Sequence, residues 1–300
     1  MKRITVILLA ILFCFSFIIG CQPNITSVTL TDDMGRTITI ESIPQRIVSH
    51  VPSITEMLFA LDLDDCIVGV DDYSIFPPEA REKPSVGNYW EPSVEKIVSL
   101  NPDLVLTDGH SESIKQLDNL GIDFVVLDPK DINGIFKDLE LLGQIAGKQD
   151  EAKKLVDNMS AKINDITAKV KNASLPRVFY VLDAKTDPNN PWTAGPGSFI
   201  DSLITMSGGI NIAGKAPGSW VQFSIEQVVA DDPQIIILGN NHGTADVAKE
   251  DLAKLPIWSK LTAVRNGDVF NFNADLANPV PRITQGLEDI AGIIHPELFK

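Results

Sequence analysis

The chain has 300 residues, of which 44% are hydrophobic and 22% charged, a globular composition long enough for two lobes that each have a core. Its formal net charge is −15. Because contacts to phosphate need clustered Lys and Arg, a chain this acidic is poorly suited to bind nucleic acid, which we exclude as a partner.

The N-terminus has the pattern of a secretory signal over residues 1–20. The basic pair Lys2-Arg3 precedes an almost wholly apolar run that ends in small residues. Ile18-Ile19-Gly20-Cys21 resembles a lipobox, in which the Cys is lipidated and becomes the new N-terminus. The alternative is an uncleaved membrane anchor in which Cys21 is an incidental thiol. No second run reaches the ~18 apolar residues that a membrane span requires. We expect lipidation at Cys21, with Cys66 a buried, inert thiol.

The first half of the chain alternates predicted strands and helices. We predict a hairpin over 29–40, strands over 47–51, 67–70 and 123–127, and helices over 53–61, 111–120 and 133–146. Ser53-Ile54-Thr55-Glu56 has the spacing of a capping box for the first of these helices. Strands and helices that alternate in this way predict a parallel sheet with right-handed crossovers.

Residues 150–171 are predicted to form one long amphipathic helix. Its apolar residues recur at helical spacing: Ala152, Leu155, Val156, Met159, Ile163, Ile166 and Val170. A helix of this length spans ~33 Å, and we interpret it as a rigid strut between two lobes. The predicted organisation is a signal peptide over 1–20, an N-terminal lobe over 21–148, a linking helix over 149–172 and a C-terminal lobe over 173–300.

The second lobe is predicted to begin with a strand over 177–182, followed by a polar loop over 183–190. A helix over 198–206 comes next, and a loop over 239–243 lies further along the chain. A last strand over 268–272 and a helix ending at Ile294 complete this lobe.

One sequence pattern occurs in both predicted lobes, at 94–106 and at 225–238. Each copy has a Glu, two apolar residues at its i+2 and i+3, a Pro seven residues after the Glu, and an apolar run. The two glutamates, Glu95 and Glu226, are 131 residues apart. Each copy predicts a short helix, a turn and a buried strand, so the chain is predicted to be α/β with two similar lobes and a ligand cleft between them. The helix dipole favours a first-turn Glu by about 0.3–1 kcal/mol, which explains one such residue but not the same position in both copies.

Aromatic residues gather in the predicted loops. Trp90, Trp192 and Trp220 lie in loops rich in Gly, Pro or Asn, and Tyr73 and Tyr89 lie in similar loops. They are either packing residues or the lining for a large flat ligand, and as a set we interpret them as a lining. We expect Trp192 and Trp220 on opposing walls. Trp258 is expected in the core. The spacing of the four His matches no metal-binding signature, and the sequence contains no catalytic motif. His50 either faces the cleft or belongs to the core or surface.

Several stretches together resemble the helical-backbone substrate-binding proteins of ABC importers. They are 49–56, 72–78, the two copies of the repeat, 208–212, 220–226 and Pro281-Arg282. The resemblance implies two Rossmann-like lobes joined by a single long rigid helix, with little hinge motion. It also implies that Glu95 and Glu226 dock onto arginines of the membrane permease.

Within that family the sequence is most similar to the cobalamin binders. Tyr73, Tyr89 or Trp90, Trp192 and Trp220 fall at positions that contact the corrin ring in those proteins. Asp108 departs from the pattern, because the cobalamin binders have a Trp there. Arg282 is the main cationic candidate in the cleft, and His50 is a further candidate.

The resemblance therefore implies a lipid-anchored receptor on the outer face of the cytoplasmic membrane that delivers a corrinoid to an ABC permease dimer. It would touch the membrane only through its lipid, need no cofactor or metal of its own, and not be an enzyme. A first alternative is a haem or ferric-siderophore binder on the same scaffold, with His50 or Tyr73 as an axial haem ligand. A second alternative is a tetrapyrrole-modifying enzyme or chelatase.

Overall fold

The computed structural model describes residues 27–241, 244–245 and 248–299. The predicted signal peptide and Cys21 lie outside these residues, as does part of the predicted loop over 239–243. Within the described ranges, no helix is both long enough and apolar enough to cross a membrane.

The first lobe is built on a four-stranded parallel sheet with the strand order β4-β3-β5-β6. Its strands are β3 (Ile47–Ser49), β4 (Ile67–Val70), β5 (Leu104–Thr107) and β6 (Phe124–Val126). Its helices are α2 (Pro52–Ala60), α3 (Val94–Ser99), α4 (Gln116–Asn119) and α5 (Ile132–Ala146), with 3-10 turns η1 (Asp64–Cys66) and η2 (Pro78–Glu82). The predicted hairpin is confirmed as the antiparallel pair β1 (Val28–Thr31) and β2 (Thr37–Ile40). The predicted parallel sheet is confirmed as well.

The second lobe has a sheet in which β9, β7, β11 and β13 run parallel, with β12 antiparallel at the end of β11. Its strands are β7 (Arg177–Val181), β9 (Ile210–Asn211), β11 (Ile235–Asn241), β12 (Thr244–Ala245) and β13 (Val269–Asn273). Its helices are α7 (Phe199–Met206), α8 (Ile225–Asp231), α9 (Lys249–Leu252), α10 (Thr262–Asn266) and α11 (Ile283–Ile294), with η3 (Trp258–Lys260) and η4 (Ala274–Ala277). A separate ribbon pairs β8 (Trp192–Ala194) with β10 (Trp220–Gln222). Trp258 is buried in the core, as predicted.

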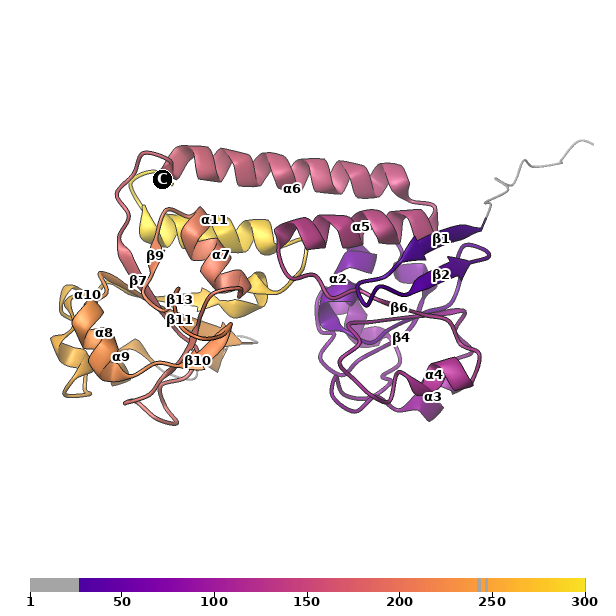
Figure 1. The fold of residues 1–300 in the computed structure, drawn as a ribbon, viewed down its shortest axis with the longest axis horizontal. Helices are drawn as coiled ribbons and strands as arrows, with labels where there is room; N and C mark the ends of the chain where they lie inside the picture. Colours follow the sequence, from indigo (N-terminus) through magenta and orange to yellow (C-terminus); the bar gives the residue numbers. More distant parts are fainter. Residues whose placement is uncertain (1–26, 242–243, 246–247, 300) are drawn as a thin grey trace, which may run out of the picture.

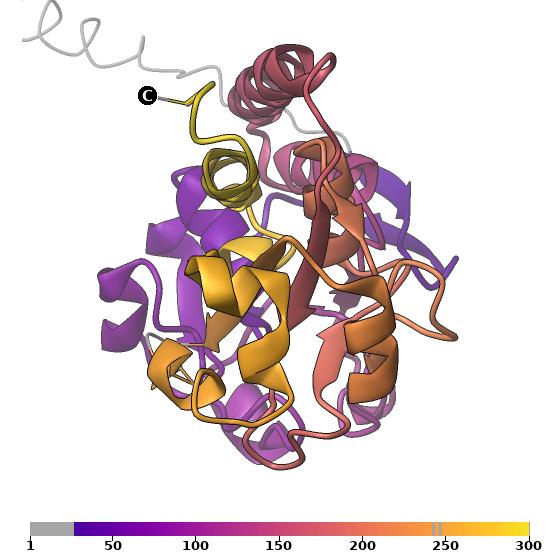
Figure 2. The ribbon, with the colours of Figure 1, turned by 90° about the vertical axis from the view of Figure 1, so that its left-hand side faces the viewer.

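The long helix α6 (Gln149–Val170) connects the lobes in the chain and lies along one side of both (Figure 1). It packs on α5 of the first lobe and on α11 of the second. Seen from the end, α6 lies at the outer edge of the molecule (Figure 2). Six of the seven residues of its predicted apolar stripe are buried, and Leu155 is partly buried. The 22-residue helix predicted from the periodicity is therefore confirmed.

Two local predictions are wrong. Helix α2 begins after Val51 with no side-chain cap, so Ser53 and Glu56 form no capping box. Pro52 starts the helix instead, because its missing N–H and fixed φ suit the first helical position. The helix predicted over 111–120 is shorter in the structure, where only α4 is helical. Ser111 to Lys115, before α4, form turns with i→i−3 hydrogen bonds.

Candidate functional site

In the first lobe, two of the four predicted ligand residues, and also Asp108, follow the carboxyl ends of parallel strands. His50 comes directly after β3, Tyr73 lies three residues after β4, and Asp108 comes directly after β5. In open α/β sheets this edge is where ligands bind. The parallel order β4-β3-β5 brings these three loops together at one edge of the sheet.

His50 lies behind this edge and not on its surface. Its side chain is fully buried, with Nε2 3.4 Å from the carbonyl oxygen of Asn88 and Nδ1 3.5 Å from the hydroxyl of Thr107. Burial lowers the pKa of His50, so the ring stays neutral at physiological pH. The imidazole is parallel to the ring of Tyr89, with 6.3 Å between the ring centroids. This placement fits the core alternative, and it puts His50 out of reach of a bound ligand.

Tyr89 and Trp90 have different environments. Trp90 is 71% exposed and meets the half-buried ring of Tyr89 edge-on, with the centroids 4.5 Å apart. The Tyr89 hydroxyl donates to the carboxylate of Asp108. Burial first, and then this carboxylate, raise the pKa of Tyr89, so its phenol stays protonated. Trp90 is thus the more available of the two to a ligand.

Asp108 also contacts His110, which the sequence analysis did not select. Nδ1 of His110 lies 3.1 Å from Oδ2 of Asp108, and about half of the His110 side chain is exposed. The only sequence signal for this pairing is their proximity in Asp108-Gly109-His110. Where the cobalamin binders are expected to have a Trp, this chain therefore has a polar cluster of Tyr89, Asp108 and His110.

Arg282 is held by a residue of the other lobe. Its guanidinium donates from Nε and Nη2 to the two carboxylate oxygens of Glu56 on α2, at 2.7 and 2.6 Å. The same guanidinium lies over the ring of Phe76, 3.6 Å from its centroid. Burial raises the pKa of Glu56, opposed by the hydrogen bonds and charge of Arg282. An anionic ligand would have to compete with Glu56 for Arg282.

Asp71 shapes the loop that carries Tyr73. Its carboxylate accepts hydrogen bonds from the backbone N–H of Tyr73 at 2.7 Å and from the hydroxyl of Ser74 at 2.6 Å. Ser74 in turn bonds to Thr55 on α2. This buried chain of polar groups fixes the base of the loop while Tyr73 and Phe76 remain exposed.

Trp192 and Trp220 lie on one ribbon, so their predicted placement on opposing walls is wrong. In the β8–β10 register Trp192 faces Gln222 and Trp220 faces Ala194. Cross-strand partners share a face and side chains alternate with a period of two, so both Trp lie on the same face as diagonal neighbours. Trp220 also meets Tyr180 at a steep angle, with 6.3 Å between the centroids. This strand pairing could not be predicted from the sequence, because the flanking residues are rich in Gly and Pro and indicate loops.

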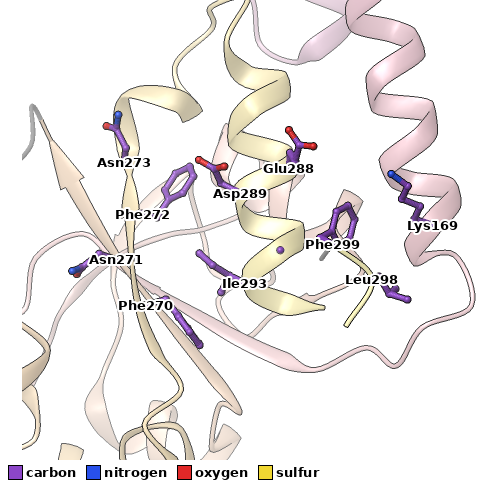
Figure 3. A pocket seen from close by; sticks show the side chains of 11 residues that line it. Lys169, Phe270, Asn271, Phe272, Asn273, Glu288, Asp289, Ile293, Leu298 and Phe299 are labelled. Carbon is purple, nitrogen blue, oxygen red and sulfur yellow. The ribbon is translucent and has the colours of Figure 1, made fainter. Parts of the chain in front are cut away.

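The two described surface hollows lie away from these aromatic residues. One, of ≈ 660 Å³, is bordered by Lys169 of α6, residues 270–273 of β13 and residues of α11 such as Asp289 (Figure 3). The other, of ≈ 350 Å³, lies beside β2 and Asp123. Neither contains a predicted ligand residue. The described residues also include no group of three or more His, Cys, Asp or Glu that could hold a metal ion.

Comparison with known proteins identifies the family. A family model described as "Periplasmic binding protein" matches residues 47–276. An uncharacterised ABC transporter substrate-binding lipoprotein of Bacillus subtilis (strain 168) is 31% identical over 287 residues, which cover 93% of this chain and 89% of that protein. The chain therefore belongs to the periplasmic binding protein family.

Two solved structures share the fold. The periplasmic vitamin B12-binding protein of Vibrio cholerae is 27% identical with a TM-score of 0.71, covering 85% of this chain and 98% of its own. A periplasmic haem-binding protein from Roseiflexus sp. RS-1, in apo form, is 26% identical with a TM-score of 0.75, and the match covers 85% of this chain and 99% of that one. The predicted two-lobed α/β fold is confirmed by these likenesses.

Proposed function

We propose that this chain is an extracytoplasmic lipoprotein that binds cobalamin or a related corrinoid and delivers it to an ABC importer. It is anchored by lipid at Cys21 to the outer face of the cytoplasmic membrane and has no catalytic activity. Membership of the periplasmic binding protein family supports a binding role, and the named relatives support a transporter as partner.

The observation that carries this proposal is the set of exposed aromatic side chains on both lobes. They are Tyr73, Phe76 and Trp90 on the first lobe and Trp192 and Trp220 on the second, each at least 39% exposed. Large aromatic residues left in water mark binding surfaces, and their faces and edges suit a flat macrocycle. The polar groups of Asp108 and His110 are available to the amide side chains of a corrinoid.

Charge favours a corrinoid over an anionic siderophore. The net charge of the chain is −15, and the cationic candidate Arg282 is already bound to Glu56. A ligand rich in carboxylates would meet a repulsive field and a guanidinium that is already occupied. A ligand whose periphery is mainly amide avoids both obstacles.

Haem is the second candidate, and His110 is the observation that favours it. An imidazole whose Nδ1 faces a carboxylate is oriented as metal-binding His residues commonly are, with Nε2 left for the metal. His110 could therefore supply an axial ligand to haem iron. Of the two axial ligands expected from the sequence, His50 is buried, whereas Tyr73 is exposed and stays a candidate beside His110.

The test is a competition. The mature chain is incubated with equal amounts of cyanocobalamin, haemin and a ferric hydroxamate, separated from free ligand by gel filtration, and its absorption spectrum recorded. We expect the corrin bands to elute with the protein. If the protein elutes with a haem spectrum, and His110→Ala loses that spectrum, the ligand is haem and not a corrinoid. Protein without any bound chromophore would contradict both candidates.

A further inference from the structure

The carboxylate of Asp108 accepts from three donors at the carboxyl end of β5. Its Oδ2 accepts from the hydroxyl of Tyr89 and lies 3.1 Å from Nδ1 of His110. Its Oδ1 accepts from the backbone N–H of His110, also at 3.1 Å. The Asp108 side chain is only 11% exposed, so protein donors satisfy this carboxylate more than water does. Two of the three contacts join Asp108 to the same residue, His110.

The backbone of the loop restricts the orientation of His110. Gly109, which separates the two residues, has a φ of 77°, a left-handed conformation that glycine adopts at little cost. Its N–H donates to the hydroxyl of Thr107, the last residue of β5, at 3.2 Å. Burial, and then the Asp108 carboxylate, raise the pKa of Tyr89, so its hydroxyl remains a donor.

A turn in the backbone explains only part of this arrangement. The bond from the N–H of His110 to Oδ1 of Asp108 is an Asx-turn, which is common in loops. It uses one oxygen, whereas the other oxygen contacts the side chains of His110 and of Tyr89, which comes from a different loop. The second oxygen therefore positions the imidazole ring and not the backbone.

This orientation leaves Nε2 of His110 available to a ligand. A neutral imidazole has a single N–H, so the proton on Nδ1 that faces Asp108 leaves the lone pair of Nε2 free. About half of the side chain is exposed, and Nε2 has no hydrogen-bond partner among the described residues. A carboxylate behind Nδ1 is the common partner of a His that binds a metal through Nε2, because it fixes the ring and makes that nitrogen more basic.

His110 cannot hold a metal ion without further ligands. The described residues include no group of three or more His, Cys, Asp or Glu that could complete a metal site. The arrangement therefore suits a metal that arrives with most of its ligands in place. Cobalt in a corrinoid is such a metal, because the corrin ring supplies four nitrogen ligands in a plane and leaves two axial positions. In cobalamin the lower position is filled by the base of the tethered nucleotide, whereas a corrinoid without that nucleotide has water there.

We propose that His110 binds the cobalt of the corrinoid as an axial ligand, and that the site therefore prefers incomplete corrinoids such as cobinamide, in which that position is open. This inference rests on the proposed function. Nε2 donates its lone pair to cobalt and a water molecule leaves, while the proton stays on Nδ1 and the oxidation state of cobalt does not change. Asp108 is a positioning residue, because it acts through the ring of His110.

Charge favours the same class of ligand. Cobinamide with cobalt(III) and two axial waters is positively charged, and the chain has a net charge of −15. The carboxylate of Asp108 adds a negative charge behind the imidazole. Cyanocobalamin is neutral and has both axial positions filled, so it gains neither contact. The site should therefore hold cobinamide more tightly than cyanocobalamin.

Electron paramagnetic resonance of bound cob(II)inamide tests the bond to cobalt. Aquacobinamide is bound to the full-length chain in detergent, reduced to cobalt(II) without oxygen and separated from free ligand. We expect each cobalt line to split into three, because one axial nitrogen couples to the unpaired electron. Histidine labelled with the heavy nitrogen isotope should give two lines in place of three. His110→Ala should abolish the splitting, and added imidazole should restore it.

Calorimetry tests the preference between the two corrinoids. We expect the wild type to bind aquacobinamide about tenfold or more tightly than cyanocobalamin, and His110→Ala to lose that preference while it still binds both. Asp108→Asn should weaken the binding of aquacobinamide about tenfold and keep the splitting. Glu112→Gln, at an exposed acid two residues after His110, is the control and should change neither property.

The outcomes separate this inference from the proposed function. Cobinamide that binds without nitrogen splitting, or splitting that persists in His110→Ala, overturns the role of His110 and leaves corrinoid binding intact. A wild type that binds cyanocobalamin as tightly as aquacobinamide overturns the preference for incomplete corrinoids. If neither corrinoid binds, the proposed function fails, and this inference fails with it.

Discussion

Asp138 is a buried carboxyl group on α5, near Asp33 of the turn between β1 and β2. Both of its carboxyl oxygens are buried, and the Asp33 side chain is the hydrogen-bond partner of its protonated form. Burial, and then the negative charge of Asp33, raise the pKa of Asp138 to about 8. A carboxyl group whose pKa is higher in the folded state stabilises the fold fully below its unfolded pKa, near 4. That contribution is lost progressively as the pH rises towards 8.

We therefore expect Asp138→Asn to stabilise the protein at high pH. The amide keeps the shape of the side chain and removes the charge, so the free energy of unfolding should rise by roughly 1–3 kcal/mol at pH 8. The gain should shrink towards zero at pH 4, where Asp138 is protonated. Urea unfolding at both pH values measures this, with the exposed Glu140→Gln on the same helix as control. Equal effects of Asp138→Asn at the two pH values would contradict the assignment.

Trp220→Ala should weaken corrinoid binding about tenfold or more without unfolding the protein. Aromatic contacts contribute about 0.5–1.5 kcal/mol beyond area burial, and Trp220 is nearly half exposed on its ribbon. Because Trp192 lies on the same ribbon face, Trp192→Ala should act in the same direction. Calorimetry measures the affinities, with Leu175→Ala, an exposed apolar residue after α6, as control. Unchanged affinity in both Trp variants would remove this ribbon from the ligand site.

At the residue scale, the sequence indicated the exposed aromatics because they lie in loops with strong Gly and Pro signals. It did not indicate Glu56 as the partner of Arg282, since the two are 226 residues apart in the chain. It also assigned Glu56 to a capping box by local spacing alone. Tertiary pairing overrode that local preference, because Arg282 of the other lobe offered a bidentate partner.

At the element scale, long periodic segments were predictable and very short ones were not. The predicted bounds of α6 and β4 lie within one residue of the observed bounds. A sustained apolar stripe at helical spacing and a short β-branched run with clear ends are strong signals. β8 and β10 have three residues each and lack any alternation long enough to detect. Their pairing arises from the fold, which brings the two loops together.

The helix ends of the repeat give an element-scale prediction. After α8, the carboxylate of Asp232 accepts from the N–H and the hydroxyl of Thr262, at 2.9 and 2.7 Å. These hydrogen bonds lower the pKa of Asp232. A carboxyl group with a lowered folded-state pKa contributes stability above its unfolded pKa, and that stability is lost as the pH falls. Asn101, its counterpart after α3, has no such acceptor role.

Asp232→Asn should accordingly destabilise the protein by roughly 0.5–1.5 kcal/mol at pH 7, since both hydrogen bonds from Thr262 lose the charge of their acceptor. Asn tolerates positive φ as Asp does, so backbone strain does not change. The difference from wild type should diminish as the pH is lowered to 3. Thermal unfolding followed by circular dichroism tests this, and Asn101→Asp is the matched control. A pH-independent loss of stability would show that the charge of Asp232 is irrelevant.

At the scale of the whole molecule, the two lobes share one hydrophobic core. A single cluster of buried residues includes Ile47 of β3, Ile163 of α6 and Ile237 of β11, and so extends from one sheet to the other. The ion pair of Glu56 and Arg282 joins the lobes at another point. The sequence showed which face of α6 is apolar, but periodicity does not tell what that face packs against. The shared core could therefore not be predicted from the sequence and is seen only in the fold.

A core that runs through both lobes predicts that they unfold together. Ile166 on α6 is 1% exposed and belongs to the shared cluster, so Ile166→Ala should cost about 2–5 kcal/mol. Far-UV circular dichroism reports on both lobes, whereas Trp fluorescence is weighted to the second, which holds three of the four Trp. In the wild type we expect the two probes to give the same urea transition. Ile166→Ala should shift both transitions equally, and Lys154→Ala, at an exposed position, should shift neither. Two separate transitions, or a shift seen by one probe only, would mean that α6 joins two independently folding lobes.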